Sequence, residues 1–216
     1  MARWTIGPVT AALFDLDGVL VDSMAAIDWC MRTWAVERGL DPDHVIALSH
    51  GRRDTDILAL ALPGTDPGPE LDRIAELDVA ALPKVRAVPG AADLLNVLEP
   101  GSWAVVTSGA AGIARARIEA AGLPVPDLMI TADDVLAGKP DPQGYLLAAE
   151  KLGVLPRHCV VFEDAEVGLL AAARAGAHRI QVGGGAPAVP LSDGWVADLT
   201  GVRAAVEGDR ILFSGR

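Results

Sequence analysis

Short apolar runs and amphipathic stretches alternate along most of this chain. Val9–Phe14 is a mainly apolar run followed by a turn signal at Gly18, which predicts a short buried strand. From Pro89 onward, helical spacing of apolar residues alternates with strand-like runs. The predicted helices are Ala91–Leu98, Gly112–Ala121, Pro142–Leu152 and Val167–Ala175, and the predicted strands are Trp103–Thr107, Asp127–Ile130, His158–Phe162 and Ala177–Val182. Repeated helix–strand units predict a parallel sheet with helices on both faces.

Residues 24–82 have a different pattern, in which no strand signal interrupts a series of short helices. The predicted helices are Ala25–Arg38, Asp43–Ser49, Thr55–Leu62 and Glu70–Leu82. We therefore predict an α/β fold, with a Rossmann-like parallel-sheet core formed by residues 1–21 and 87–216 and an all-helical cap formed by residues 22–86. The tail Arg210–Arg216 fits either an added edge strand or contact with a partner.

Composition and charge narrow the possible partners and cellular location. The chain has 216 residues, of which 51% are apolar, so one large domain or a domain with a modest insert is expected. No secretory signal and no membrane-spanning run are present, and Cys30 and Cys159 lack metal-ligand spacing. These features predict a cytoplasmic protein with reduced thiols. The formal charge of −11 argues against nucleic acid and membrane partners, so an anionic substrate would need a local cation.

Acidic and hydroxyl side chains follow three of the predicted strands. Asp15 and Asp17 are two residues apart, so in extended geometry their side chains point the same way. Thr107-Ser108-Gly109 and Glu163-Asp164 follow later strands. In a parallel sheet the carboxyl ends of the strands meet at one edge, where such folds bind ligands. The hydroxyls and backbone N–H groups suit phosphate oxygens, and the acids predict a metal or catalytic site.

Lys139 adds a positive charge to this set. It is one of only three lysines in the chain and lies in the loop Gly138-Lys139-Pro140-Asp141-Pro142 before a predicted helix. Several carboxylates that converge on a phosphate dianion repel one another and need compensation. A hard divalent cation held by oxygen ligands, Mg²⁺, supplies it.

Together these motifs resemble those of a known family. In chain order they are Asp15-Leu16-Asp17-Gly18 with Asp22-Ser23, then Thr107-Ser108-Gly109, then the loop around Lys139, and then Phe162-Glu163-Asp164. In this order and at these strand ends they resemble the haloacid dehalogenase (HAD) superfamily of phosphotransferases. The helical insert after the first motif resembles the subgroup that contains β-phosphoglucomutase and the small sugar-phosphate and polyol-phosphate phosphatases.

The resemblance implies a role for each core residue. Asp15 would attack phosphorus and form an aspartyl-phosphate, while Asp17 would act as general acid and base. Thr107 and Lys139 would be catalytic through their contacts with the phosphoryl oxygens, with Ser108 and Gly109 as further phosphate-binding positions. The resemblance also implies a Mg²⁺ site made by Asp15, the backbone carbonyl of Asp17, Asp164 and Glu163, with Glu163 either a direct ligand or a neighbour of one.

The cap segment favours one activity over its rivals. His50-Gly51-Arg52-Arg53 resembles a segment of 2-deoxyglucose-6-phosphate and glycerol-phosphate phosphatases, so His50, Arg52 and Arg53 are candidate substrate-binding residues. The expected function is hydrolysis of a small phosphorylated sugar or polyol, by a monomer or a homodimer. A phosphomutase similar to β-phosphoglucomutase is the alternative, and a non-catalytic sugar-phosphate-binding regulator is a third possibility.

Overall fold

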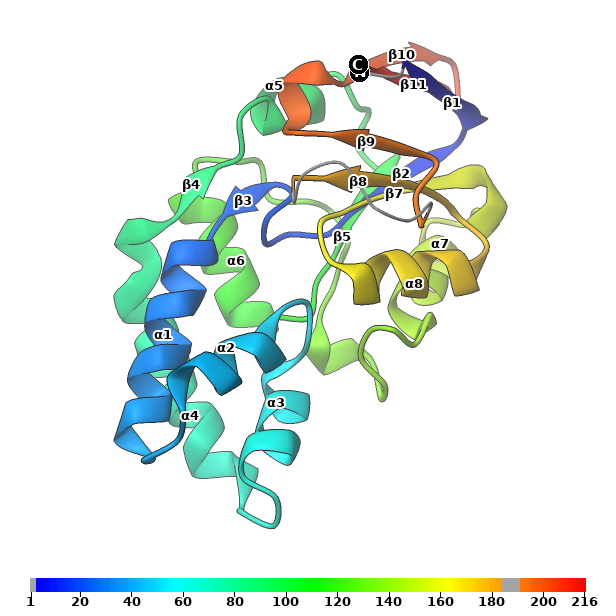
Figure 1. Ribbon diagram of the computed structural model, residues 1–216. Coiled ribbons are helices and arrows are strands. Elements are labelled where there is room, and N and C mark those ends of the chain that lie inside the picture. The colour runs from blue at the N-terminus through cyan, green and yellow to red at the C-terminus, as the bar shows by residue number, and fades with distance from the viewer. Residues whose placement is uncertain (1–2, 184–190) are drawn as a thin grey trace.

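The computed structural model describes residues 3–183 and 191–216 (Figure 1). A six-stranded parallel sheet is its centre, with the strand order β6-β5-β2-β7-β8-β9. In that order the strands span Met129–Ile130, Trp103–Val106, Ala11–Phe14, Cys159–Glu163, His178–Val182 and Gly194–Val196. The predicted parallel sheet is therefore confirmed, and the first acidic motif follows one of its two central strands.

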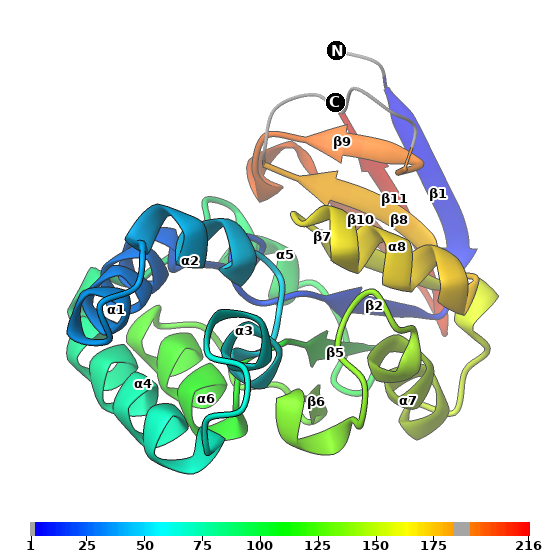
Figure 2. The same ribbon diagram turned by 60° about the horizontal axis from the view of Figure 1, so that its bottom comes forward.

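Helices and a second sheet cover the two faces of this sheet. On one face Leu13 and Val161 pack against α7 (Gln143–Lys151) and α8 (Glu166–Ala175), which are visible beside the sheet in Figure 2. On the other face Phe14 and Phe162 pack against α5 (Ala91–Leu95), α6 (Ala111–Ala120) and the smaller sheet. Alternate residues of β2 thus contribute to opposite apolar clusters, because strand side chains alternate between faces.

The smaller sheet is antiparallel and joins the two ends of the described chain. Its order is β1-β11-β10, with β1 at Trp4–Val9, β11 at Arg210–Gly215 and β10 at Arg203–Glu207. The predicted strand Val9–Phe14 is therefore wrong in extent, because the chain passes from the small sheet to the large sheet near Thr10. The backbone N–H of Thr10 donates to the carbonyl of His158, which precedes β7 of the large sheet. The tail is also not an edge strand: β11 is the middle strand, and its ring Phe213 packs edge-on against Phe162 at 5.4 Å between centroids.

A separate helical layer lies between β3 (Val21–Asp22) and β4 (Arg86–Ala87) in the chain and is seen below the sheet in Figure 1. It consists of α1 (Met24–Glu37), α2 (Pro42–Ser49), α3 (Asp54–Ala61) and α4 (Pro67–Ala81), followed by the 3₁₀ turn Leu82–Lys84. These helices share their own apolar cluster around the fully buried Trp34, whose indole N–H donates to Glu70. Proline at the first helical position and an aspartate N-cap begin both α2 and α4.

Two segments of the chain, one leading into this layer and one leading out of it, connect it to the rest of the molecule. They lie side by side as the short antiparallel pair β3 and β4, with Val21 opposite Ala87. Further local elements are the 3₁₀ turns Ala132–Asp134, Pro156–His158 and Leu199–Gly201. No helix in residues 3–183 or 191–216 combines the length and apolar character needed to cross a membrane.

Candidate active site

Three neighbouring strand ends bring the predicted core residues together. Asp15 follows β2, Thr107 follows β5, and Glu163 is the last residue of β7, with β5 and β7 on either side of β2. All three side chains are buried. The backbone N–H of Asp15 donates to the carbonyl of Phe162, which continues the β2–β7 pairing past the end of β2. The parallel register therefore places these groups at one edge of the sheet, as the sequence predicts.

Lys139 lies between two of the acids. Its ammonium group is 2.5 Å from Oδ1 of Asp15 and also contacts Oε1 of Glu163, although the three residues are far apart in sequence. Burial alone would lower the pKa of Lys139, but the charges of Asp15 and Glu163 raise it well above its usual value. The lysine therefore keeps its positive charge at the bottom of the site.

Glu163 has little freedom to bind anything else. Its carboxylate accepts hydrogen bonds from the Tyr145 hydroxyl at 2.9 Å and from the Ala165 backbone N–H at 3.0 Å, in addition to Lys139. The side chain is completely buried. A side chain at Gly168 would overlap it, since a Cβ there would lie 1.7 Å from Oε1. Glu163 is thus held as an acceptor for Lys139.

Asp164 and Asp15 provide the oxygen atoms suited to a metal ion. One oxygen from each of Asp15, Glu163 and Asp164 lies within 4.8 Å of the others, a spacing compatible with a single cation. Burial, and then the charge of Glu163, raise the pKa of Asp164 to about 7. Carboxylate oxygens are the ligands that Mg²⁺ prefers. The residues present therefore fit such an ion, with Asp15 and Asp164 less occupied by other partners than Glu163.

Asp17 is held by two side chains, and the sequence analysis did not predict that they would meet there. Ser23 donates to Oδ1 of Asp17, and the guanidinium of Arg117 donates to Oδ2 at 2.9 Å. Arg117 also donates to Asp78 of α4 at 2.6 Å, and both of these residues are buried. A single arginine from α6 thus joins Asp17 to the helical layer. Arg117 and Asp78 are the main site residues that the sequence analysis missed.

The segment at residues 50–52 faces the strand ends from the helical layer. The imidazole of His50 is 3.8 Å from Asp164, and the carbonyl of Gly51 accepts a hydrogen bond from Ser108 at 2.9 Å. Gly51 has φ +71° and lies so close to α8 that a Cβ would be 2.7 Å from Val167. This glycine therefore permits the close approach of the two parts of the molecule.

The two adjacent arginines take different positions. Arg52 lines the pocket between the strand ends and the helical layer, and it donates to the carbonyl of Leu48. Arg53 instead pairs with Asp56 at 2.8 Å and donates to the carbonyls of Val135 and Leu136. The structure thus brings Arg52, but not Arg53, to the wall of the pocket that contains Asp15.

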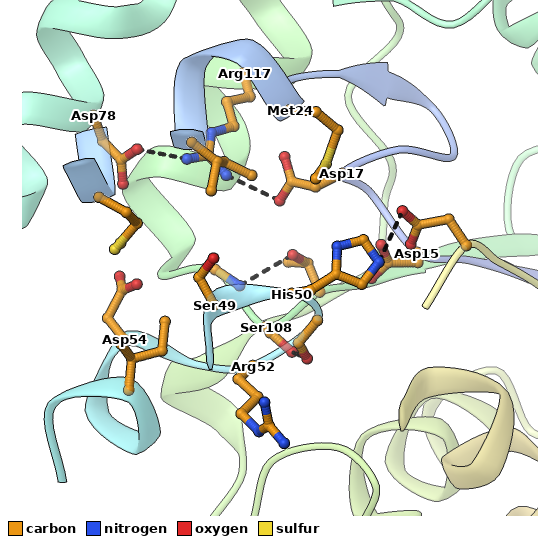
Figure 3. Close-up of a pocket in the computed structure, with 17 residues that line it drawn as sticks. Asp15, Asp17, Met24, Ser49, His50, Arg52, Asp54, Asp78, Ser108 and Arg117 are labelled. Atoms are coloured by element: carbon orange, nitrogen blue, oxygen red, sulfur yellow. Dashed lines mark hydrogen bonds and ion pairs between the residues drawn. The ribbon is translucent and has the colours of Figure 1, made fainter. Parts of the chain in front are cut away.

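Figure 3 shows how charge is distributed in this pocket. Five aspartates line it, namely Asp15, Asp17, Asp54, Asp78 and Asp164, together with the basic residues His50, Arg52 and Arg117. Thr107, Ser108 and Gly109 line the same pocket on the core side. In the figure Asp15 and Asp78 lie toward opposite sides, so the pocket extends from the strand ends to α4.

Known proteins are similar in sequence to this chain. A family model described as haloacid dehalogenase-like hydrolase matches residues 9–176. Hexitol phosphatase A of Escherichia coli is 42% identical over 175 residues, covering 79% of this chain and 81% of that protein. Glycerol-1-phosphate phosphohydrolase 2 of Saccharomyces cerevisiae is 37% identical over 81% of this chain and 74% of its own length.

A solved structure of a hydrolase has a similar fold. A hydrolase from Pseudomonas syringae superimposes with a TM-score of 0.74 and 26% identity, covering 88% of this chain and 94% of its own. The region matched by the family model contains strands β2, β5, β6 and β7 of the parallel sheet, the helical layer and the strand-end residues described above. This chain belongs to the haloacid dehalogenase-like hydrolase family.

Proposed function

We propose that this protein is a Mg²⁺-dependent phosphatase that hydrolyses a small phosphorylated sugar or polyol through an aspartyl-phosphate on Asp15. The observation that carries the proposal is the buried contact of Lys139 with Asp15 and Glu163, directly beside Asp17 and below the helical layer. The proposal is further supported by the similarity to a hexitol phosphatase and a glycerol-1-phosphate phosphohydrolase.

In the first step a carboxylate oxygen of Asp15 forms a bond to phosphorus, and the bond from phosphorus to the sugar oxygen breaks. Lys139 contacts Oδ1 of Asp15, so Oδ2 is the oxygen we assign to the attack. Asp17 gives a proton to the departing sugar oxygen. Asp17 then takes a proton from water, whose oxygen bonds to phosphorus and releases phosphate and the Asp15 carboxylate.

Other residues bind and orient the phosphoryl group. Thr107 is buried at the end of β5, and we assign its hydroxyl, with the backbone N–H of Ser108, to the phosphoryl oxygens. The backbone N–H of Gly109 donates to the Thr107 hydroxyl at 3.1 Å and orients it. We propose Asp15, Asp164 and the carbonyl of Asp17 as the residues that hold Mg²⁺, with Glu163 outside the ligand shell because its oxygens are already bonded. The ion, when bound, supplies positive charge that balances the phosphate.

We also propose that residues 22–86 act as a cap that closes over this site, with the core formed by residues 1–21 and 87–216. The separate apolar cluster of α1–α4 and the paired segments β3 and β4 support these boundaries. Contacts at Gly51 and Arg53 hold the two parts together and limit the access of water.

A phosphomutase remains the alternative, since it would use the same aspartyl-phosphate. A mutase must bind a second phosphate on the cap side of the pocket. Asp54 and Asp78 lie there, and Arg117 is already paired with two carboxylates, so Arg52 is the remaining arginine of the pocket. This charge distribution favours hydrolysis. The non-catalytic regulator is the least favoured alternative, because binding alone would not require both Asp15 and Asp17.

Phosphate release from sugar and polyol phosphates, measured with Mg²⁺ and with a chelator, tests the proposal. Wild-type protein should release phosphate only with the metal. Asp15→Asn should abolish turnover, and Asp17→Asn should lower kcat/KM by about 10²–10⁴-fold, the usual contribution of a general acid–base group.

Asp72→Asn, at an exposed position of α4, is the matched control and should retain wild-type activity. Turnover by Asp15→Asn would exclude the covalent intermediate, and isomerisation without phosphate release would identify a mutase.

A further inference from the structure

Asp54 differs from the other aspartates of the pocket because its carboxylate has no partner among the described residues. Each of the others faces a basic side chain: Lys139 for Asp15, Arg117 for Asp17 and Asp78, and His50 for Asp164. Within residues 3–183 and 191–216, no hydrogen bond or ion pair uses the side chain of Asp54. It is the first residue of α3, so the helix sets the position of its backbone. An acceptor of this kind is left for a ligand.

The surroundings of Asp54 indicate which part of a ligand it would meet. Figure 3 shows Asp54 on the side of the pocket where Asp78 lies, away from Asp15. The side chain is partly buried, and burial followed by the charge of Asp78 raises its pKa to about 7. The pocket wall also includes four apolar side chains, which are Met24, Ile27, Met31 and Ile57. A substrate whose phosphate is at Asp15 would extend its other end toward this region.

We propose that Asp54 is a specificity-determining residue that accepts hydrogen bonds from hydroxyl groups at the end of the substrate distant from the phosphate. This inference rests on the proposed function, since the phosphate site fixes the direction of the substrate. Above pH 7, where Asp54 is ionised, its carboxylate only accepts hydrogen bonds, so it suits the hydroxyls of a polyol or sugar. The apolar side chains of the wall suit the C–H groups of the same carbon chain.

The same charge distribution excludes a second class of substrates. A distal phosphate or carboxylate would add negative charge beside Asp54 and Asp78, where Arg117 already bonds to two carboxylates. Substrates with neutral, hydroxyl-rich ends are therefore preferred over bisphosphates and phosphorylated acids. A site built to bond hydroxyls also discriminates against esters that lack them, because the partly buried acceptor would remain unpaired.

The first arm of the test measures kcat/KM for wild type, Asp54→Ala and Asp54→Asn with three esters: sorbitol 6-phosphate, fructose 1,6-bisphosphate and p-nitrophenyl phosphate. Asp54→Ala should lower kcat/KM for sorbitol 6-phosphate by about 10–100-fold, the value of a hydrogen bond to a charged group. Its activity on p-nitrophenyl phosphate should stay within about threefold of wild type. Asp54→Asn should raise the relative rate on the bisphosphate. Equal losses with all three esters would overturn the inference.

The second arm measures binding, so that it does not depend on turnover. Sorbitol 6-phosphate is titrated calorimetrically into Asp15→Asn protein and into Asp15→Asn/Asp54→Ala protein, with Asp15→Asn/Asp72→Asn as the matched control. The Asp54→Ala change should weaken binding at least tenfold, and the Asp72→Asn change should not. Equal binding by all three proteins would refute the role of Asp54 alone. Binding that depends on Asp54 in a protein whose wild type releases no phosphate would refute the proposed function alone.

Discussion

At the scale of single residues, Arg117 determines how Asp17 is held. Its guanidinium bonds one carboxylate from the core and one from α4, and nearly all of its surface is buried. A buried arginine is tolerated only when its charge is paired. With Ser23 on the other oxygen, Asp17 has both carboxylate oxygens in contact with the protein. For Asp17 to protonate a leaving group, one of these bonds has to be exchanged for a bond to substrate.

The unpartnered Asp54 leads to a prediction about stability and pH. The charged groups that face it are Asp17, Asp78 and Arg117, with Cys30 nearby. Its pKa is raised from 3.8 to about 7 in the folded protein, so the folded state binds an extra proton between these values. The associated stability is present below pH 4 and is lost as pH rises through about 7.

Asp54→Asn removes this dependence, because the amide does not titrate. The free energy of unfolding of Asp54→Asn minus that of wild type should therefore increase from pH 5 to pH 8. Urea unfolding at each pH measures the difference, and Asp72→Asn should show none. A difference that is constant with pH would contradict the assigned pKa of Asp54.

The core site residues could be predicted from the sequence because each follows a strand. Asp15, Thr107 and Glu163 meet wherever parallel strands are neighbours, and this follows from topology alone. Arg117 and Asp78 could not be paired in this way, since they lie near the C-terminal ends of two helices whose packing depends on the tertiary structure. A signal for Arg117 was nevertheless present: it lies among Ala114, Ile118 and Ala121 on the apolar side of its helix.

At the scale of elements, Arg53 connects α3 with the loop that carries Lys139. Its guanidinium donates to the carbonyls of Val135 and Leu136, and its Nε would be 2.6 Å from a Cβ at Gly138. The bonds of Arg53 with Asp56 hold the guanidinium in this orientation. Whether Arg53 also meets substrate stays a prediction, but its contacts assign it to holding the helical layer against the core.

Arg53→Ala should therefore loosen the closed arrangement. We expect kcat/KM to fall about tenfold, consistent with the loss of hydrogen bonds to a charged group, and cleavage of the α2–α3 region by a protease to become faster. Arg73→Ala is the matched control, since within the described part of the chain Arg73 pairs with Glu37 and Glu76, both in the helical layer. Phosphate release and limited proteolysis measure the two effects. Equal behaviour of the two variants would show that Arg53 does not hold the parts together.

Most of the helices and strands of the core were predictable within a few residues, because their apolar periodicity is clear. The short strands β9 and β10 were not predicted, since their residues are only partly buried and give weak alternation. The division between β1 and β2 was missed for another reason. Apolar residues continue through both strands, and only tertiary structure determines that β1 pairs with β11.

At the scale of the whole molecule, the small antiparallel sheet stabilises the core through Phe213. This ring is completely buried and contacts Phe162, which itself stacks on Phe14 at 4.9 Å between centroids. The aromatic series extends from β11 through β7 to β2, the strand that precedes Asp15. The stability of the catalytic core therefore depends on a segment more than 190 residues away in sequence.

Phe213→Ala should lower the free energy of unfolding by about 3–5 kcal/mol, the usual cost of removing a buried aromatic ring. The adjacent Leu212 is 43% exposed, so Leu212→Ala is the matched control and should cost less than about 1 kcal/mol. Urea denaturation followed by circular dichroism measures both. Similar values for the two variants would show that the ring does not support the core.

The pairing of β1 with β11 also has a consequence for how the protein is made. Of the described strands, β1 is synthesised first and β11 last, and β11 is the strand to which β1 is hydrogen-bonded. At roughly 5–20 residues per second, the ribosome takes on the order of 10–40 s to travel between them. During this interval Trp4 and Ile6, which are buried in the folded protein, have no β11 to pair with. The nascent chain therefore carries an unpaired, partly apolar strand until β11 has been made. During that time the strand is exposed to aggregation and to chaperones.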